Sequence, residues 1–304
     1  MFKRRELPPV EWPTLLLAGV IYAGWIAATR LHDQLHPVAL ALLGGWLIAW
    51  HGSLQHEVIH GHPTPWRRLN DALAALPLSL WLPYEIYRRS HLRHHASEHL
   101  AHPAHDPEAR YLPVGSGWRH GVALAAARAQ STLAGRLALG PIIDAARFLA
   151  AEARRLVRDQ DDSRAVWLRH LAGVAVVLAW LQFDCGFSLG DYLLLFVYPG
   201  LALTLIRSFA EHRAGADPGG RVAIVERAPV FGLLFLNNNL HAAHHQWPGL
   251  AWWRLPARYR AHREALLAAN GGLVYAGYGE VFSRFLFRPH DVLAHPDTAP
   301  EAAV

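Results

Sequence analysis

Four apolar segments of roughly membrane-spanning length constrain the fold of this chain more than any other feature. They cover residues 12–30, 37–55, 166–183 and 189–210. A transmembrane helix needs about 20 consecutive apolar residues, and a helix satisfies its own backbone hydrogen bonds where no water is present. We therefore expect an all-α integral membrane protein built on a four-helix transmembrane bundle, with the remaining helices cytoplasmic or interfacial.

The composition agrees with this expectation. Hydrophobic residues make up 52% of the 304-residue chain and charged residues only 17%, against about 25% charged in a typical soluble domain. The single cysteine, Cys185, excludes a disulfide framework and any cysteine-based zinc or iron–sulfur site. We expect residues 1–288 to form one domain and the polar residues 289–304 to form a flexible tail.

Positive charge is distributed unevenly about the four spans. The connectors at residues 31–37 and 182–191 contain no lysine or arginine, whereas segment 56–165 contains 14 arginines. Positive residues accumulate on the cytoplasmic side of membrane proteins. Both termini and the middle segment are therefore expected in the cytoplasm, at a bacterial inner membrane. Contact with anionic lipid headgroups accounts for the net charge of +5 without nucleic acid.

Three weaker segments are expected to lie at or beside the membrane. The short apolar run Ala72–Leu82 contains Pro77 and predicts an interfacial or half-inserted helix. Residues 123–139 and 142–158 have helical periodicity and predict two helices separated at Gly140-Pro141.

Eight of the 21 histidines form three clusters with helical spacing, each after an apolar segment. The first reads HEVIH, the second HLRHH and the third HAAHH. Residues three and four apart share one face of a helix, so each cluster directs two or three imidazoles the same way. Neutral imidazole binds iron, zinc, copper and nickel, and so many ligands exceed the needs of one ion. The clusters are His56 and His60; His91, His94 and His95; and His241, His244 and His245.

The order HxxxH, HxxHH, HxxHH on a four-span chain resembles the membrane fatty acid desaturase and hydroxylase superfamily, over about residues 15–260. The acidic stretch Asp106–Glu108 and the asparagine-rich lead-in Asn237–Asn239 are similar to features of that family. The resemblance implies a centre of two iron ions. It also implies a further ligand after the last span, where His212 stands. The metal ligands would then be His56, His60, His91, His94, His95, His212, His241, His244 and His245.

Polar side chains near the clusters are expected to orient the imidazoles, as second partners of metal-bound histidines usually do. The candidates are Glu57, Glu211, Glu98, Asp106 and Asn237–Asn239. Two further histidines remain open as ligands: His62, which could compete with His60, and His51 on the second span. Residues His99, His102 and His105 follow the second cluster and are expected to form a solvated face.

The resemblance implies O2-dependent desaturation of a fatty acyl chain bound as a lipid or a thioester. The chain has no flavin, haem or iron–sulfur signature, so electrons must come from an external ferredoxin-, rubredoxin- or cytochrome-type donor. Arginines of segments 56–165 and 254–263 are expected to form a complementary surface for an acidic donor. Arginines next to the second cluster are candidates to hold an anionic substrate group; they are Arg88, Arg89 and Arg93.

Other functions remain open. Hydroxylases and carotenoid ketolases share the three clusters, and the choice between them depends on sub-ångström substrate placement. HEVIH also matches the HExxH motif of zinc metalloproteases, in which Glu57 would be the general base. That reading leaves HLRHH and HAAHH unused. A haem or metal carrier would place paired histidines in mid-span, whereas these lie at the predicted cytoplasmic ends.

Overall fold

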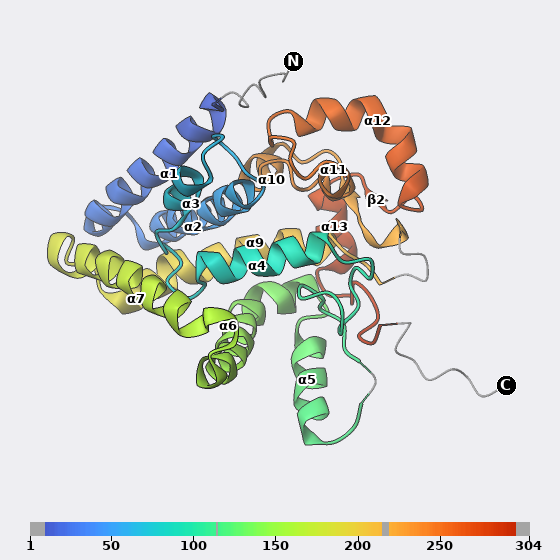
Figure 1. The fold of residues 1–304 in the computed structure, drawn as a ribbon, viewed down its shortest axis with the longest axis horizontal. Coiled ribbons are helices and arrows are strands. Elements are labelled where there is room, and N and C mark those ends of the chain that lie inside the picture. The colour runs from blue at the N-terminus through green and yellow to red at the C-terminus, as the bar shows by residue number, and fades with distance from the viewer. Residues whose placement is uncertain (1–9, 114, 215–218, 296–304) are drawn as a thin grey trace, which may run out of the picture.

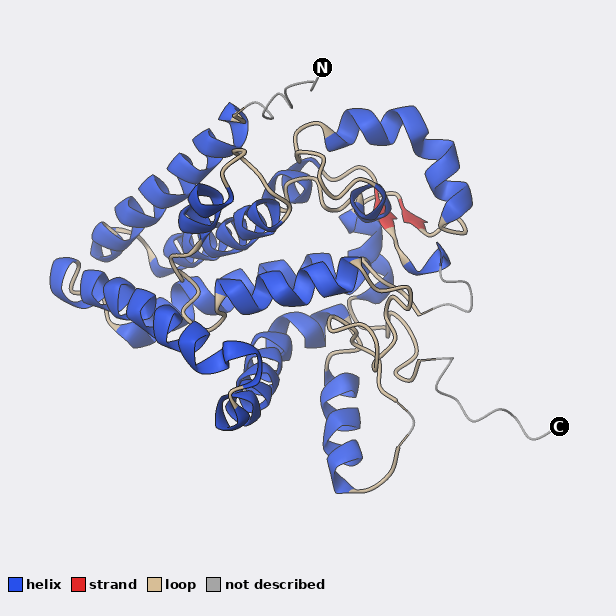
Figure 2. Cartoon of the chain, viewed as in Figure 1, coloured by secondary structure: helices blue, strands red, loops and turns tan. Residues whose placement is uncertain are grey.

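The computed structural model describes residues 10–113, 115–214 and 219–295. Over these residues the regular secondary structure is almost entirely helical, and loops join the helices (Figure 1, Figure 2). The strands found there form one small parallel sheet, in which β1 (Ile224–Val225) pairs with β2 (Val274–Tyr275). The prediction of an all-α protein is confirmed.

Four helices are long and apolar enough to cross a membrane, and they match the four predicted spans. Their outward faces are strongly apolar: Leu168 is 72% and Phe183 85% exposed. Such surface is stable against hydrocarbon and costly in water. The spans are α1 (Trp12–Arg30), α2 (Pro37–Ile59), Gln160–Asp184 with α7 (Ser163–Ala179), and Leu189–Ala210 with α8 (Leu189–Tyr192) and α9 (Tyr198–Ala210).

Small residues bring α2 and α9 into close contact. A Cβ atom at Gly45 would lie 2.8 Å from the Cβ of Pro199, and one at Gly200 would lie 2.5 Å from the Cβ of Ile48. Glycine at such crossings lets helix backbones approach closely within a membrane, where packing replaces the hydrophobic effect as the driving force. This contact fixes α2, whose last turn carries the first histidine cluster.

The predicted interfacial helix at Ala72–Leu82 is wrong. Helix α3 (Arg67–Ala74) ends early, and the chain continues as turns. Pro77 cannot donate a backbone hydrogen bond, and Leu78 is completely buried with its carbonyl accepting from the Tyr192 hydroxyl at 2.7 Å. The segment is therefore a partly buried turn beside the spans. The Tyr192 side chain on α8 donates the hydrogen bond that the Leu78 carbonyl requires.

The predicted helix break at Gly140-Pro141 is also wrong. Helix α5 (Trp118–Ala129) ends earlier, and α6 (Leu133–Arg158) runs through both residues. A proline inside a helix removes one hydrogen bond, but here the helix packs on α9. A Cβ atom at Gly140 would lie 2.6 Å from Leu205. Tertiary packing outweighs the local signal to break.

Five shorter helices complete the described part of the chain and carry two of the histidine clusters. In Figure 1 they lie mainly beside and to the right of the spans. They are α4 (Tyr84–His95), α10 (Pro229–Leu234), α11 (His241–Gln246), α12 (Leu255–Ala269) and α13 (Tyr278–Phe285).

Residues 289–295, the first part of the predicted flexible tail, contact the rest of the chain. The backbone N–H of Leu112 donates to the carbonyl of Leu293 at 2.8 Å, and the side chain of His295 is 0% exposed. These residues therefore pack against the segment that follows the second histidine cluster. Residues 296–304 of the predicted tail lie outside the described residues.

Candidate metal centre

The structure brings all nine predicted histidines into two groups. Within each group the candidate ligand atoms lie within 4.8 Å of one another. Most of these side chains are buried, in keeping with groups that face one another and not solvent. The first group is His56, His60, His91, His95 and His244, and the second is His94, His212, His241 and His245.

The histidine doublets divide between the two groups. His94 belongs to the second group and His95 to the first, and likewise His244 belongs to the first and His245 to the second. Neighbouring residues on an α-helix point about 100° apart, because one turn takes 3.6 residues. Each HH doublet at the end of α4 or within α11 therefore supplies one imidazole to each group. This geometry accounts for the form HxxHH.

The separations between imidazoles fit ligands on shared metal ions. Two nitrogens, each about 2.1 Å from a metal, lie roughly 3.0 Å apart in a right-angled arrangement and roughly 3.4 Å apart in a tetrahedral one. The observed distances are nearer the first value. The Nε2 atoms are 3.1 Å apart in His60–His91 and His91–His95, and 3.0 Å apart in His95–His244 and His212–His241.

Two carboxylates fix the imidazoles of the second cluster from behind. Nδ1 of His94 donates to Asp106 Oδ1 at 2.8 Å, and Nδ1 of His91 donates to Glu108 Oε1 at 3.0 Å. With the proton on Nδ1, each Nε2 carries its lone pair toward its group. The ring orientation and the tautomer are thus both set for metal binding.

Two uncharged oxygen atoms orient other imidazoles of the second group in the same way. Nδ1 of His241 donates to Asn238 Oδ1 at 2.9 Å, and Nδ1 of His212 donates to the Arg221 carbonyl at 3.2 Å. Burial, and next the positive field of His94, lower the pKa of His212 to about 3. The His212 imidazole is therefore neutral at pH 7.

Burial also lowers the pKa of imidazoles in the first group. Burial, and next the positive field of His91, together lower the pKa of His95 to about 3. Neutral imidazoles whose lone pairs face one another at about 3 Å repel unless a cation lies between them. The residues present therefore fit two metal ions, one in each group.

The two carboxylates that were foremost candidates to orient an imidazole have other nearest partners. Glu57 accepts the Trp252 backbone N–H at 3.1 Å, while its other oxygen is 3.9 Å from His56 Nδ1, too far for a hydrogen bond. Glu211 Oε1 pairs with Arg207 Nε at 2.8 Å.

Among the other orienting candidates, the outcome is divided. Asp106 and Asn238 contact histidines of the groups, as described above. Glu98 is exposed and belongs to neither group. Glu108 holds His91 although it is not among the predicted orienting residues; the two carboxylates that follow HLRHH are the signal in the sequence for this role.

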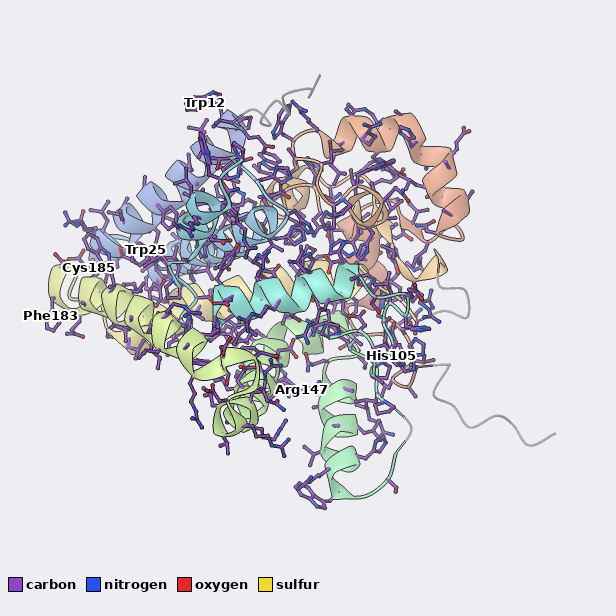
Figure 3. The ribbon with its side chains drawn as sticks, viewed as in Figure 1. Trp12, Trp25, His105, Arg147, Phe183 and Cys185 are labelled. Atoms are coloured by element: carbon purple, nitrogen blue, oxygen red, sulfur yellow. The ribbon has the colours of Figure 1, made fainter. Side chains whose placement is uncertain are left out.

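The histidines left open as ligands lie outside both groups. His62 donates through Nδ1 to Glu11 Oε1 at 2.7 Å, and His51 lies 3.3 Å from the Tyr22 hydroxyl. His99, His102 and His105 gather around one another instead, with ring centroids 4.7 to 6.4 Å apart. Figure 3 shows His105 in the loops near the end of α4, far from Cys185 and Phe183 at the opposite end of the spans.

A cavity of about 460 Å³ adjoins the second group. His212, Asp106 and Glu108 form part of its wall. Apolar side chains from the spans and from α10 and its surroundings form another part; they include Ile48, Leu201, Leu205, Phe209 and Phe235. A volume of this size is typical of sites for small organic ligands.

The chain matches one known protein family over most of its length. A family model described as fatty acid desaturase matches residues 33–277, which is most of the chain and contains all nine histidines. The chain belongs to the fatty acid desaturase family. It is accordingly an integral membrane oxidoreductase of fatty acyl chains. No individual curated protein matches the chain.

Proposed function

We propose that this desaturase-family protein introduces a double bond into a fatty acyl chain in an O2-dependent reaction, with two iron ions held by the nine histidines. The observation that carries the proposal is the pair of convergent imidazole groups, the second of which borders, through His212, a cavity with a partly apolar wall. Zinc would fit nitrogen ligands as well, but it has no redox chemistry. Oxidation of a methylene group requires a redox-active metal such as iron.

The reaction consumes one O2, two electrons and two protons, and converts one CH2–CH2 unit into CH=CH with release of two water molecules. When bound, the iron pair would supply O2 activation and removal of the two hydrogens. The chain supplies the positioning: Asp106 and Glu108 hold His94 and His91, and Asn238 holds His241.

The cavity would hold the acyl chain against the second imidazole group. Its apolar wall from α2 and α9 excludes water, which keeps an oxidising centre from side reactions. The acyl chain would reach it as a lipid or a thioester. Hydroxylation and carotenoid ketolation would use the same centre, and they differ from desaturation in their products.

A zinc protease reading has less support than desaturation. In such enzymes the glutamate of HExxH activates a metal-bound water. Here one Glu57 oxygen accepts the Trp252 N–H, and His91, His95 and His244 converge with the histidines of HEVIH. A protease has no use for these additional imidazoles.

The electrons would come from a ferredoxin-, rubredoxin- or cytochrome-type protein. The single cysteine leaves no means of holding an iron–sulfur cluster in the chain itself. Exposed arginines on and beside α12, which include Arg254, Arg258 and Arg260, offer a positive surface for an acidic donor. Purified protein supplied with O2 but no reductant should be inactive.

The metal centre and both termini would face the cytoplasm of a bacterial inner membrane. The arginine-free connectors 31–37 and 182–191 support this orientation. Figure 3 agrees with it, since Cys185 in the second connector lies at the opposite end of the spans from His105.

Expression in a bacterium followed by mass spectrometry of cellular lipids tests the reaction. Acyl chains lighter by about two mass units, absent with a His94→Ala variant, are the expected result. A gain of about sixteen would replace desaturation with hydroxylation. Unchanged acyl chains together with an altered carotenoid would replace it with ketolation.

A further inference from the structure

One face of α6 lines part of the cavity. Arg136, Gly140 and Asp144 are four residues apart, and Arg147 follows three residues later, so all four share a face of the helix. The structure places Arg136, Asp144 and Arg147 in the cavity wall. Arg147, labelled in Figure 3, is also exposed. Charged side chains on this face of α6 therefore extend from the molecular surface to the cavity wall.

Two polar groups on this wall lack partners. Nη1 of Arg136 and Oε1 of Gln130 are buried and have no hydrogen-bond partner among the residues that the structure describes. Both side chains reach the same place: a Cβ atom at Gly140 would lie 3.2 Å from Arg136 Cδ and 3.1 Å from Gln130 Oε1. An unsatisfied buried polar group costs about 1–3 kcal/mol, so the Nη1 donor of Arg136 indicates a ligand that supplies an acceptor.

Two acids in the cavity wall form ion pairs with other arginines. Asp144 is paired with Arg110 at 2.7 Å, and Glu211 is paired with Arg207 at 2.8 Å. Burial and the positive charge of Arg110 lower the pKa of Arg136 to about 9. An arginine remains protonated at neutral pH even so. Arg136 therefore presents to the cavity a charged donor, Nη1, that no described protein group accepts from.

We infer that Arg136 binds the anionic head of the acyl substrate, a carboxylate or a phosphate, at the α6 wall of the cavity. Guanidinium is suited to this role because its planar fork donates two parallel hydrogen bonds to either group. The inference rests on the proposed function, since it takes the cavity to hold an acyl chain. The apolar residues Leu205 and Phe209 lie in the same cavity wall and would contact the start of that chain.

The arginines near the second histidine cluster, which the sequence suggests as binders of an anionic substrate group, do not fit that role in the structure. Arg88, Arg89 and Arg93 do not line the cavity. Arg89 forms an ion pair with Glu85 and donates to the carbonyl of Asp161. Its donors are therefore used within the protein, whereas Nη1 of Arg136 is not.

Binding to the full-length purified protein in detergent tests the inference without turnover. Affinities for palmitate, dipalmitoyl phosphatidic acid and methyl palmitate would be measured by native mass spectrometry. The variants are Arg136→Gln, Arg136→Lys and, as a matched control, Arg154→Gln. Arg154 lies on the same helix, is exposed and does not line the cavity.

Arg136→Gln should weaken binding of at least one anionic lipid about tenfold or more, because a charge-assisted hydrogen bond is lost. Arg136→Lys should retain part of the affinity, and Arg154→Gln should retain all of it. Methyl palmitate should bind all variants equally. An effect on palmitate alone would identify a free carboxylate as the head, and an effect on phosphatidic acid alone would identify a lipid phosphate.

Thermal unfolding separates ligand binding from a structural role. Arg136 also donates through Nε to the Gln130 carbonyl at 3.2 Å, and a purely structural residue would lower the unfolding temperature when replaced. Replacing a residue that serves chiefly to bind the ligand should leave that temperature unchanged or raised, because a buried charge is costly to hold. Unchanged anion affinity in Arg136→Gln would overturn the inference, as would an equal loss for methyl palmitate. Absence of desaturation with the affinities as expected would overturn only the proposed reaction.

Discussion

Nδ1 of His94 donates to Oδ1 of Asp106 at 2.8 Å, and both side chains are almost completely buried. The same carboxylate accepts the backbone N–H groups of Ala101 and Glu108, each at 2.8 Å. Burial opposes ionisation of Asp106, but these three hydrogen bonds lower its pKa. A carboxylate held in this way fixes the loop after α4 and the imidazole together.

Asp106→Asn should therefore weaken iron binding by about 10–100-fold, as is usual for partners that orient metal-bound histidines. The amide keeps the shape but loses the charge that favours the Nδ1 proton. Iron content after dialysis against a buffered range of free Fe2+ measures the effect. Glu98→Gln, at an exposed acid outside both groups, is the control. Equal iron affinity in the Asp106 variant and the wild type would contradict the role.

Metal removal should destabilise the protein. The nine imidazoles would then face one another without a cation, and a metal that binds only the folded state adds to its stability. Elemental analysis should find two iron ions per chain, and the unfolding temperature should fall after treatment with a chelator and recover with Fe2+. A single zinc ion with no second site would contradict the di-iron assignment.

Glu57→Gln should leave measurable desaturation. The amide oxygen can still accept the Trp252 N–H that Glu57 now binds at 3.1 Å. His91→Ala and His244→Ala should each abolish desaturation, since both imidazoles belong to the first group. Product formation in cellular lipids measures all three. A zinc protease would give the reverse pattern: it would lose activity with Glu57→Gln and keep it in both alanine variants.

Gly200→Ala should destabilise the bundle. The new methyl group would lie 2.5 Å from the Cβ of Ile48, where neither helix can move without losing other contacts. Overpacking of this kind costs about 1–3 kcal/mol. The unfolding temperature in detergent measures it, with Gly19→Ala as the control, because a Cβ there meets nothing within 4 Å. An unchanged unfolding temperature for Gly200→Ala would argue against the α2–α9 packing.

Cysteine labelling should report the orientation in the membrane. In a Cys185→Ser background, Asp33→Cys lies in an arginine-free connector and Glu98→Cys lies after α4, and both positions are exposed. A membrane-impermeant maleimide added to spheroplasts should modify the cysteine at 33 and spare the one at 98 until the membrane is permeabilised. Labelling in the opposite order would reverse the proposed topology.

The four spans and the three histidine clusters could be predicted from the sequence because both are local patterns. A span requires only that about 20 successive residues be apolar, and a cluster requires only spacing along one helix. Both signals are readable without knowledge of the packing. The family resemblance rests on the same short motifs, and the match over residues 33–277 agrees with it.

The tertiary structure alone decided how these parts combine. The sequence did not show that the HH doublets divide between two groups, or that Glu108 holds His91 while Glu57 binds the backbone of Trp252. It also suggested a break at Gly140-Pro141 that does not occur. The physical reason is the same in each case: contacts between residues distant in the chain depend on how helices cross. The energy of that packing outweighs the preference of any short segment.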